Sequence, residues 1–437
     1  MRKKQQNSDN FNQQNGRRLR IAFFDYPDVF EDFYPHYGVT QEVFAKTWHN
    51  TGNHAWLKIV QEEIGDITWY VACLTPELKE SRHEYIGCKM KFFSSSWLHR
   101  KLWKLFYQPS FAWRWKRFYR TYATLASYLS LLSFSFFRTL KNDRPDIVFV
   151  QEYCSGRFDV LLFFAWLLNI PVLTFHAGST PDKYLGKFLR KYTIPRADWI
   201  FSSGQGELNM LLHRFKVAPH KLNIIRPPID TSIYKPLSRE QACISLGLDP
   251  GKRYWLFIGR LDDAVKRVSS ILDKFKQIAK EFPEIDLLIV GTGKDEQKLK
   301  RMAHDLVEGR VHFLGWIADD ASKARIYNTA DCLFLASWRE GFPTVIGEAF
   351  SCGIPVASSR VGAIDDLVVP DKSGWLFPKG DDEAMYRCFS DIADNPGTLV
   401  KMRPIVRSMA EEMVSFEAMT IALKKGFSAV TTDITNV

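Results

Sequence analysis

Short apolar runs recur along this chain, separated by segments long enough to hold a helix. Such runs, bounded by polar or turn-forming residues, are typical of strands buried in a parallel sheet. Strands that alternate with amphipathic helical segments predict an α/β fold. The expected strands are Leu19 to Phe24, Thr68 to Leu74, Asp146 to Val150, Val172 to Phe175, Trp199 to Ser202, Tyr254 to Ile258, Asp286 to Val290, Val311 to Leu314, Cys332 to Leu335 and Val356 to Ser358.

The domain organisation follows from length and from one proline-rich connection. A chain of 437 residues is long for a single core, so we expect two doubly wound, Rossmann-like α/β domains facing across a cleft. Three prolines between Arg226 and Pro236 mark the connection. The expected parts are a disordered polar tail over 1–18, an N-terminal domain over 19–228, a C-terminal domain over 229–414, and a last helix, about 415–437, that rejoins the N-terminal domain.

Cysteine usage and the first residues indicate the compartment. The chain has seven cysteines without a Cys-x-x-Cys pair or metal-ligand spacing, which is typical of reduced thiols in a cytosol. Residues 1–16 are polar and rich in Asn and Gln, with no apolar core of a signal peptide. We therefore expect a cytoplasmic protein.

Two glutamates, Glu340 and Glu348, bracket the most informative segment of the chain. The segment follows an apolar strand, is broken by Gly341 and Pro343, and leads into an apolar helix that we expect to start at Thr344. The N–H groups in the first turn of a helix lack intrahelical acceptors and can bind a phosphate. Because carboxylates repel a diphosphate, the two glutamates are expected to hold sugar or ribose hydroxyls. An ordinary surface loop with two acids is the alternative.

Positive charge for a diphosphate comes after the strand Tyr254 to Ile258. Arg260 offers a planar fork that matches phosphate oxygens, and Lys266 offers a point charge. Both follow the carboxyl end of a strand, where ligands of open α/β sheets bind. Gly291 ends the next strand and would let a ligand approach the backbone. Solvated surface charges are the alternative interpretation of Arg260 and Lys266.

The sequence offers no metal site that we could recognise. No Asp-x-Asp occurs in the chain, and no Cys/His cluster has the spacing of a zinc site. We therefore expect no metal and no cofactor.

The segment from Glu340 to Val356, with Arg260 and Lys266 before it, resembles the family 4 glycosyltransferases of the GT-B fold, which carry a Glu, seven residues, Glu motif in similar surroundings. The resemblance implies a retaining transferase that uses a nucleotide-diphosphate sugar. It implies catalytic roles for Glu340 and His176 and a ribose contact for Glu348. The substrate-binding positions that it implies or that the residues suggest are Gly38, Arg260, Lys266, Gly291, Gly315, Phe342, Pro343, Thr344, Val345 and Glu348.

The N-terminal half is expected to bind the acceptor, a glycan or lipid-linked molecule in lipopolysaccharide, exopolysaccharide, glycolipid or other glycan synthesis. His176 ends a strand where the resembled family has a histidine near the donor sugar. Without that resemblance, a histidine after an apolar strand is more often packed or capping. Gly38 stands alone in the loop after the first strand, where many relatives have two glycines.

A basic and aromatic stretch covers Lys89 to Arg120. Such stretches bind anionic lipid surfaces, so membrane contact through 89–120 is one hypothesis and packing of the aromatic residues in the core is another. Nucleic acid is disfavoured because no recognised module accompanies the stretch. Residues Thr121 to Phe137 carry no charge but are too short and Ser-rich to span a bilayer, so we expect a packed helix.

Two other classes of protein remain open. A nucleotide-sugar epimerase or a phosphorylase also pairs two such domains, but the additional acids or the cofactor lysine that these need are not evident. A catalytically silent adaptor that binds lipid or glycan is the other alternative. The joint presence of Arg260, Lys266, Glu340, Glu348 and His176 argues against it.

Overall fold

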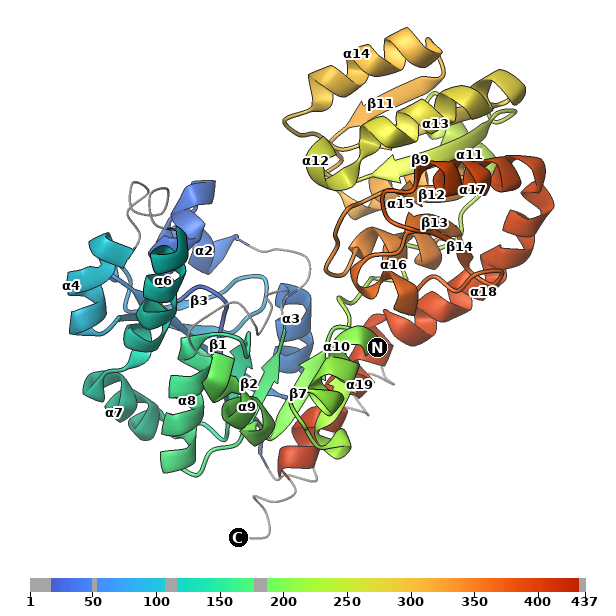
Figure 1. The fold of residues 1–437 in the computed structure, drawn as a ribbon. Helices are drawn as coiled ribbons and strands as arrows, with labels where there is room; N and C mark the ends of the chain where they lie inside the picture. The colour runs from blue at the N-terminus through green and yellow to red at the C-terminus, as the bar shows by residue number, and fades with distance from the viewer. Residues whose placement is uncertain (1–16, 49–52, 107–115, 177–186, 432–437) are drawn as a thin grey trace. The chain divides into compact units, whose positions relative to one another are not determined.

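The computed structural model describes residues 17–48, 53–106, 116–176 and 187–431 (Figure 1). The chain divides into two compact units. The first comprises Met1–Ile225 together with Thr420–Val437, and the second comprises Arg226–Met419. Each unit is an α/β domain built on a largely parallel sheet, as the alternation of strands and helices predicted.

The first unit is built on an eight-stranded sheet of order β3-β4-β2-β1-β5-β6-β7-β8, in which only β3 runs antiparallel to its neighbour. Chain order reverses at β1, which lies between β2 and β5. This switch point is where ligands of doubly wound sheets bind. The strands are β1 (Leu19–Phe24), β2 (Gly65–Cys73), β3 (Glu80–Arg82), β4 (Lys89–Ser94), β5 (Ile147–Gln151), β6 (Val172–Phe175), β7 (Trp199–Ser202) and β8 (Leu222–Ile224).

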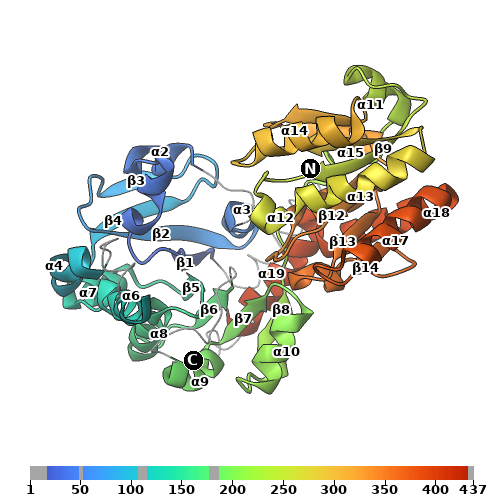
Figure 2. The ribbon, with the colours of Figure 1, turned by 45° about the horizontal axis from the view of Figure 1, so that its top comes forward.

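Helices cover both faces of this sheet. In both views α4, α6, α7 and α8 gather on one side (Figure 1, Figure 2). On the other side α19 pairs with α3 through Lys424 and Glu63, 3.0 Å apart. The helices are α2 (Gln41–Lys46), α3 (Asn53–Glu63), α4 (Trp97–Phe106), α6 (Lys116–Leu131), α7 (Phe134–Asp143), α8 (Gly156–Leu167), α9 (Lys187–Thr193), α10 (Gln205–His213) and α19 (Phe416–Thr431), with 3-10 turns η1 (Phe30–Asp32), η2 (Tyr34–Tyr37), η3 (Ile194–Arg196) and η4 (Pro219–Lys221).

The second unit has a fully parallel six-stranded sheet of order β11-β10-β9-β12-β13-β14, with its switch point between β9 and β12. Helices α13, α14 and α17 pack together, and α15 and α16 form a second group. The strands are β9 (Arg253–Ile258), β10 (Ile285–Val290), β11 (Val311–Gly315), β12 (Cys332–Leu335), β13 (Val356–Ser359) and β14 (Gly374–Phe377); the helices are α11 (Arg239–Ser245), α12 (Asp263–Lys266), α13 (Val268–Glu281), α14 (Glu296–Val307), α15 (Asp320–Thr329), α16 (Thr344–Ser351), α17 (Asp382–Asp394) and α18 (Pro396–Met413), with 3-10 turn η5 (Gly362–Asp366).

Aromatic side chains make up much of each core. In the first unit Phe23 of β1 contacts Trp69 of β2, and Phe149 of β5 contacts Phe427 of α19. In the second unit Trp255 lies 4.5 Å from Phe334 between ring centroids. Aromatic side chains bury large apolar areas, so these contacts stabilise each sheet strongly.

Three expectations for the first unit were wrong. Lys89–Ser94, assigned to a basic amphipathic stretch, is strand β4 in register with β2. The uncharged segment 121–137 is not one helix, because α6 ends at Leu131 and Ser133 caps the new helix α7 by accepting from the N–H of Phe136. Arg17 and Arg18, counted in the tail, form ion pairs with Asp146 and Asp66. Residues 1–16 lie outside the described residues.

Candidate functional site

A lysine, a glutamate and a serine form a hydrogen-bonded group at the carboxyl edge of the second sheet. Lys266 ends α12, beyond β9, and its Nζ donates to Oε1 of Glu340 at 2.6 Å. The hydroxyl of Ser337, just after β12, donates to the same oxygen at 2.6 Å. Both charged side chains are mostly buried, at 19% and 11% exposed. The group therefore sits at the switch point of this sheet, where the sequence predicted a ligand.

Glycines bring the loops behind this group into close backbone contact. A Cβ on Gly291 would lie 2.0 Å from the carbonyl oxygen of Gly259, at a φ of 124° that favours glycine. A Cβ on Gly293 would lie 2.4 Å from the carbonyl oxygen of Leu261. We predicted that Gly291 would let a ligand approach the backbone. In the structure the loop at Gly259 approaches the Gly291 backbone. Gly315 differs, because a Cβ there would meet nothing within 4 Å.

Arg260 directly follows Gly259 and is exposed. Within the part of the chain that the structure describes, no ion pair is formed by its guanidinium. Lys266, the other predicted phosphate ligand, is already neutralised by Glu340. The two cations therefore differ in this structure, because only Lys266 is held by a carboxylate.

Helix α16 begins as predicted, with Thr344 as its first residue and Pro343 as its N-cap. Phe342, Thr344 and Val345 are all partly exposed. The first N–H groups of a helix have no intrahelical acceptor and carry partial positive charge. Since Glu340 lies three residues before the N-cap, these donors lie close in sequence to the Lys266 group.

Glu348 is more deeply buried than a simple ribose contact requires, at 8% exposed. Its Oε2 accepts from the hydroxyl of Tyr327, on α15, at 2.7 Å. Burial raises the pKa of the Glu348 carboxyl, opposed by the charge of Lys323 and the Tyr327 hydrogen bond. One oxygen of Glu348 is therefore already engaged within the protein, which the sequence did not indicate.

In the first unit Gly38 closes the 3-10 turn η2 with a φ of 70°. A Cβ there would meet nothing within 4 Å, so only the backbone conformation requires glycine. Thr40, two residues later, caps α2 by accepting from the N–H of Val43. Gly38 thus closes the last turn of the segment between β1 and α2.

His176 follows β6 and lies between two glutamates, the buried Glu152 and the partly buried Glu207. Its Nδ1 lies 3.4 Å from Oε1 of Glu207, and its Nε2 lies 3.7 Å from Oε1 of Glu152. Tyr153 stacks on the imidazole at 5.2 Å between centroids and donates its hydroxyl to Glu207. Neither glutamate was predicted from the sequence. Glu152 could have been found, because it lies two residues after the predicted strand that ends at Val150.

A metal can be held only where several ligand atoms converge. Glu152, Cys154 and His176 each place one ligand atom within 4.8 Å of the others. This group could not be recognised in the sequence, because the three residues come from two loops that only the fold brings together.

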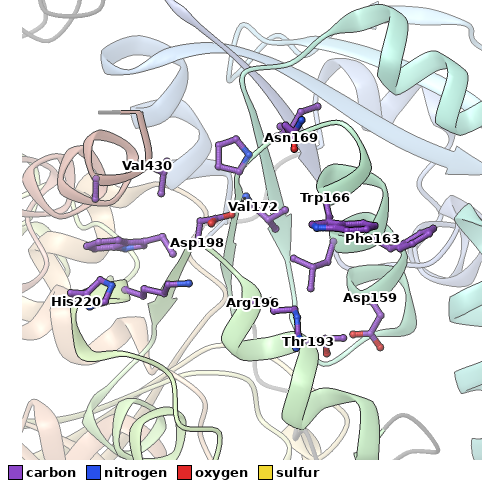
Figure 3. A pocket seen from close by; sticks show the side chains of 16 residues that line it. Asp159, Phe163, Trp166, Asn169, Val172, Thr193, Arg196, Asp198, His220 and Val430 are labelled. Atoms are coloured by element: carbon purple, nitrogen blue, oxygen red, sulfur yellow. Dashed lines mark hydrogen bonds between the residues drawn. The ribbon is translucent and has the colours of Figure 1, made fainter. Parts of the chain in front are cut away.

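A large pocket lies elsewhere in the first unit, with a volume of about 1170 Å³. Val172 and Trp199, the first residues of β6 and β7, line it, so it lies at the amino edge of the sheet. Figure 3 shows Phe163 and Trp166 of α8 on its wall, with rings stacked 6.1 Å apart. This pocket was not predicted from the sequence.

Comparison with known proteins agrees with the resemblance. Residues 252–395 match the model "Glycosyl transferases group 1", and residues 69–233 match the model "Glycosyltransferase Family 4". The D-inositol 3-phosphate glycosyltransferase of Mycolicibacterium gilvum is 26% identical over 276 residues, which are 58% of this chain and 60% of that protein. The protein of the same name from Corynebacterium glutamicum is 23% identical over 285 residues, 59% of this chain and 66% of that protein. The chain therefore matches less than two thirds of the length of these relatives.

Solved structures share the fold. HepE of Anabaena in complex with UDP has a TM-score of 0.65 at 15% identity, over 94% of this chain and all of that one. Sucrose-phosphate synthase of Thermosynechococcus elongatus has a TM-score of 0.64 at 16% identity, over 95% of this chain and all of that one. Two doubly wound units with these neighbours make a GT-B fold. With one family model in each unit, the chain belongs to the family 4-like, group 1 glycosyltransferases.

Proposed function

We propose that this protein is a retaining glycosyltransferase that moves a sugar from a nucleotide-diphosphate sugar to an acceptor hydroxyl. The observation that carries the proposal is the Lys266, Glu340 and Ser337 group beside the start of α16. The cations and helix N–H groups suit a diphosphate, and the carboxylate suits a sugar hydroxyl. UDP bound to the Anabaena neighbour makes UDP the first nucleotide to test.

Charge develops on the diphosphate as the bond between the sugar and the phosphate oxygen breaks. Arg260 and Lys266 would stabilise that charge together with the N–H groups of Thr344 and Val345. Binding of the diphosphate would draw Lys266 away from Glu340, and the released carboxylate would then orient the sugar. Transfer with retention places the acceptor on the face that the leaving phosphate vacates, so the phosphate oxygen can take the acceptor proton. None of these steps needs a metal.

Glu348 and His176 have narrower proposed roles. The Tyr327 hydrogen bond fixes the Glu348 carboxylate, and its second oxygen would accept from a ribose hydroxyl. His176 would contact the transferred sugar, as the family resemblance implies. Gly38, Gly315, Phe342 and Pro343 would shape the substrate-binding loops.

The acceptor is proposed to be a glycan or a lipid-linked molecule. D-inositol 3-phosphate, which the relatives' name contains, is a reasonable first acceptor to test.

Membrane contact through 89–120 also remains a proposal. In that segment Lys91 is paired with Asp143 at 2.6 Å, but Trp97 is 65% exposed with Lys101 over its ring at 4.9 Å. Within the described residues, no helix combines the length and the apolar character that crossing a membrane requires. We propose a cytoplasmic protein, peripheral at the inner face of the plasma membrane.

A thermal-shift panel tests the donor. A ligand at one hundred times its dissociation constant stabilises the folded state by about 2.7 kcal/mol, so UDP, GDP and ADP can be ranked against their nucleosides. We expect one diphosphate and its sugar conjugate to raise the melting temperature, while the matching nucleoside raises it little. Hydrolysis or transfer from that conjugate, with the product sugar keeping its anomeric configuration, would support the proposal. Binding without turnover toward any acceptor would favour the adaptor, and conversion to an isomeric nucleotide sugar would favour the epimerase.

Vesicle sedimentation tests the membrane proposal. The protein should sediment with vesicles rich in anionic lipid and should be released as the salt concentration rises. A Trp97→Ser variant should sediment less. Equal binding to neutral vesicles, or none to either kind, would assign the stretch to core packing.

A further inference from the structure

The group formed by Glu152, Cys154 and His176 has three different ligand types at the carboxyl edge of the first sheet. Glu152 directly follows β5, Cys154 lies two residues later, and His176 directly follows β6. Their ligand atoms all lie within 4.8 Å of one another. Parallel strands that are neighbours in the sheet bring their carboxyl ends together, which explains why the loops after β5 and β6 meet here.

Glu152 carries an unsatisfied polar atom. Glu152 is 2% exposed, and among the residues that the structure describes its Oε2 has no hydrogen-bond partner, while its Oε1 accepts from the N–H of Cys154 at 3.2 Å. A buried carboxylate oxygen without a partner is destabilising. Glu152 also has a φ of 83°, which a non-glycine residue rarely adopts. Strained backbone of this kind is found at binding and catalytic sites.

The carboxylate of Glu207 contacts the other nitrogen of the His176 ring. Oε1 of Glu207 faces Nδ1 of His176, on the side of the ring opposite Glu152. Oε2 of Glu207 is held in turn by the N–H and the hydroxyl of Ser203, at 2.7 Å and 2.9 Å. A histidine that binds a metal through one nitrogen usually gives the other N–H to such a carboxylate, which fixes the ring and its tautomer.

We propose that Glu152, Cys154 and His176 bind a divalent transition metal of the zinc class, with Glu207 as the positioning residue behind His176. One thiolate, one imidazole and one carboxylate suit Zn²⁺ and exclude a preference for Mg²⁺, which takes oxygen ligands. Tetrahedral zinc places its ligand atoms about 3.3 to 3.6 Å apart. The 3.7 Å between His176 Nε2 and Glu152 Oε1 is close to that spacing, and water would fill the fourth position.

The proposed metal site shares His176 with the proposed transfer chemistry, whose diphosphate ligands, Arg260 and Lys266, lie in the second unit. Metal on Nε2 occupies a nitrogen of His176 that could otherwise contact a sugar, so zinc should inhibit transfer if His176 takes part in it. This inhibition depends on the proposed function, whereas metal binding itself does not.

Calorimetry with Zn²⁺ on the full chain, stripped with a chelator and dialysed, tests the proposal. We expect one Zn²⁺ per chain and no binding of Mg²⁺. Glu152→Gln and Cys154→Ser should each weaken Zn²⁺ binding at least a hundredfold, and Glu207→Gln should weaken it about tenfold. Cys243→Ser is the matched control, because Cys243 is also buried but lies in the second unit, and it should bind Zn²⁺ as the wild type does.

Cobalt supplies a readout that only direct ligation can give. Co²⁺ bound by Cys154 should show a thiolate charge-transfer band that disappears in Cys154→Ser and persists in Cys243→Ser. The UDP thermal shift of each variant establishes that it is folded. No Zn²⁺ binding by the wild type, or equal binding by wild type, Glu152→Gln and Cys154→Ser, would overturn the proposal. Zinc binding by a wild-type protein whose melting temperature UDP does not raise would contradict the proposed function but not the metal site.

Discussion

The two units have the same doubly wound design but arrange their polar residues differently. In the second unit the charged group at the switch point is already paired, with Glu340 accepting from Lys266 and from Ser337. In the first unit a carboxylate oxygen of Glu152 is buried with no hydrogen-bond partner in the described parts of the chain, and His176 lies between two acids. A paired site can exchange one partner for a ligand, whereas an under-neutralised acidic site attracts a cation. The comparison therefore supports the two proposals, an anionic donor bound by the second unit and a metal bound by the first.

Replacing Lys266 by Ala should have the largest effect on turnover. The change removes a cation from the leaving group and also leaves Glu340 without its ion-pair partner. Loss of one preorganised group that stabilises transition-state charge typically lowers kcat by about a hundredfold to a thousandfold. Steady-state kinetics with the donor found in the thermal-shift panel measures this. Lys280→Ala, exposed in the last turn of α13, is the control and should leave kcat unchanged. A kcat within threefold of wild type for Lys266→Ala would remove the lysine from the mechanism.

Two glycine substitutions test whether the close contact between the loops at Gly259 and Gly291 stabilises the second unit. Gly291→Ala puts a methyl group 2.0 Å from the carbonyl oxygen of Gly259, and such overpacking costs up to about 3 kcal/mol. Gly315→Ala meets nothing within 4 Å and should cost only about 1 kcal/mol, because its φ of 70° alone is unfavourable for alanine. Urea unfolding of both variants compares them. Equal destabilisation would mean that the contact between the two loops does not matter.

Glu340→Gln should separate binding from transfer. Without its charge, Glu340 no longer competes with a phosphate for Lys266, so a nucleoside diphosphate should bind up to about tenfold more tightly. Transfer should nevertheless fall, since the sugar loses its carboxylate. Parallel measurement of Kd and kcat gives the result. Weaker diphosphate binding in this variant would show that the ion pair helps to build the site instead of competing with the ligand.

A chelator should have the smallest effect on transfer. The proposed leaving-group chemistry uses Arg260, Lys266 and helix N–H groups, so EDTA should not lower the rate. If zinc bound at His176 inhibits, EDTA should raise the rate slightly. Loss of activity in EDTA that Mn²⁺ or Mg²⁺ restores would contradict a metal-independent donor site.

The contrast between the units also explains what the sequence could reveal. Strands such as Trp199–Ser202 and Cys332–Leu335 were predicted to the residue, because a continuous apolar run flanked by polar residues has one reasonable interpretation. Strand β4 was missed, because Lys89 and Lys91 alternate with apolar residues on a strand near the edge of the sheet and the pattern resembles a basic amphipathic segment.

The arrangement of the site residues could likewise be predicted only where it depends on residues close in sequence. Glu340 and the start of α16 are close in sequence, so their proximity could be predicted. The Tyr327 contact to Glu348 and the assembly of Glu152, Glu207 and His176 depend on which strands are neighbours. Strand order is set by packing over the whole sheet, and the local pattern does not contain it.

Calorimetry with UDP and with uridine on Arg260→Ala tests the central claim, that the cations of the second unit bind the diphosphate of a nucleotide donor. Hydrogen bonds to charged groups contribute about 1.5 to 3 kcal/mol, so UDP binding should weaken about tenfold to a hundredfold. Uridine should bind almost as it does to the wild type. Arg260→Lys should recover only part of the affinity, because lysine lacks the planar fork. Equal weakening toward UDP and uridine, or none toward either, would contradict the claim.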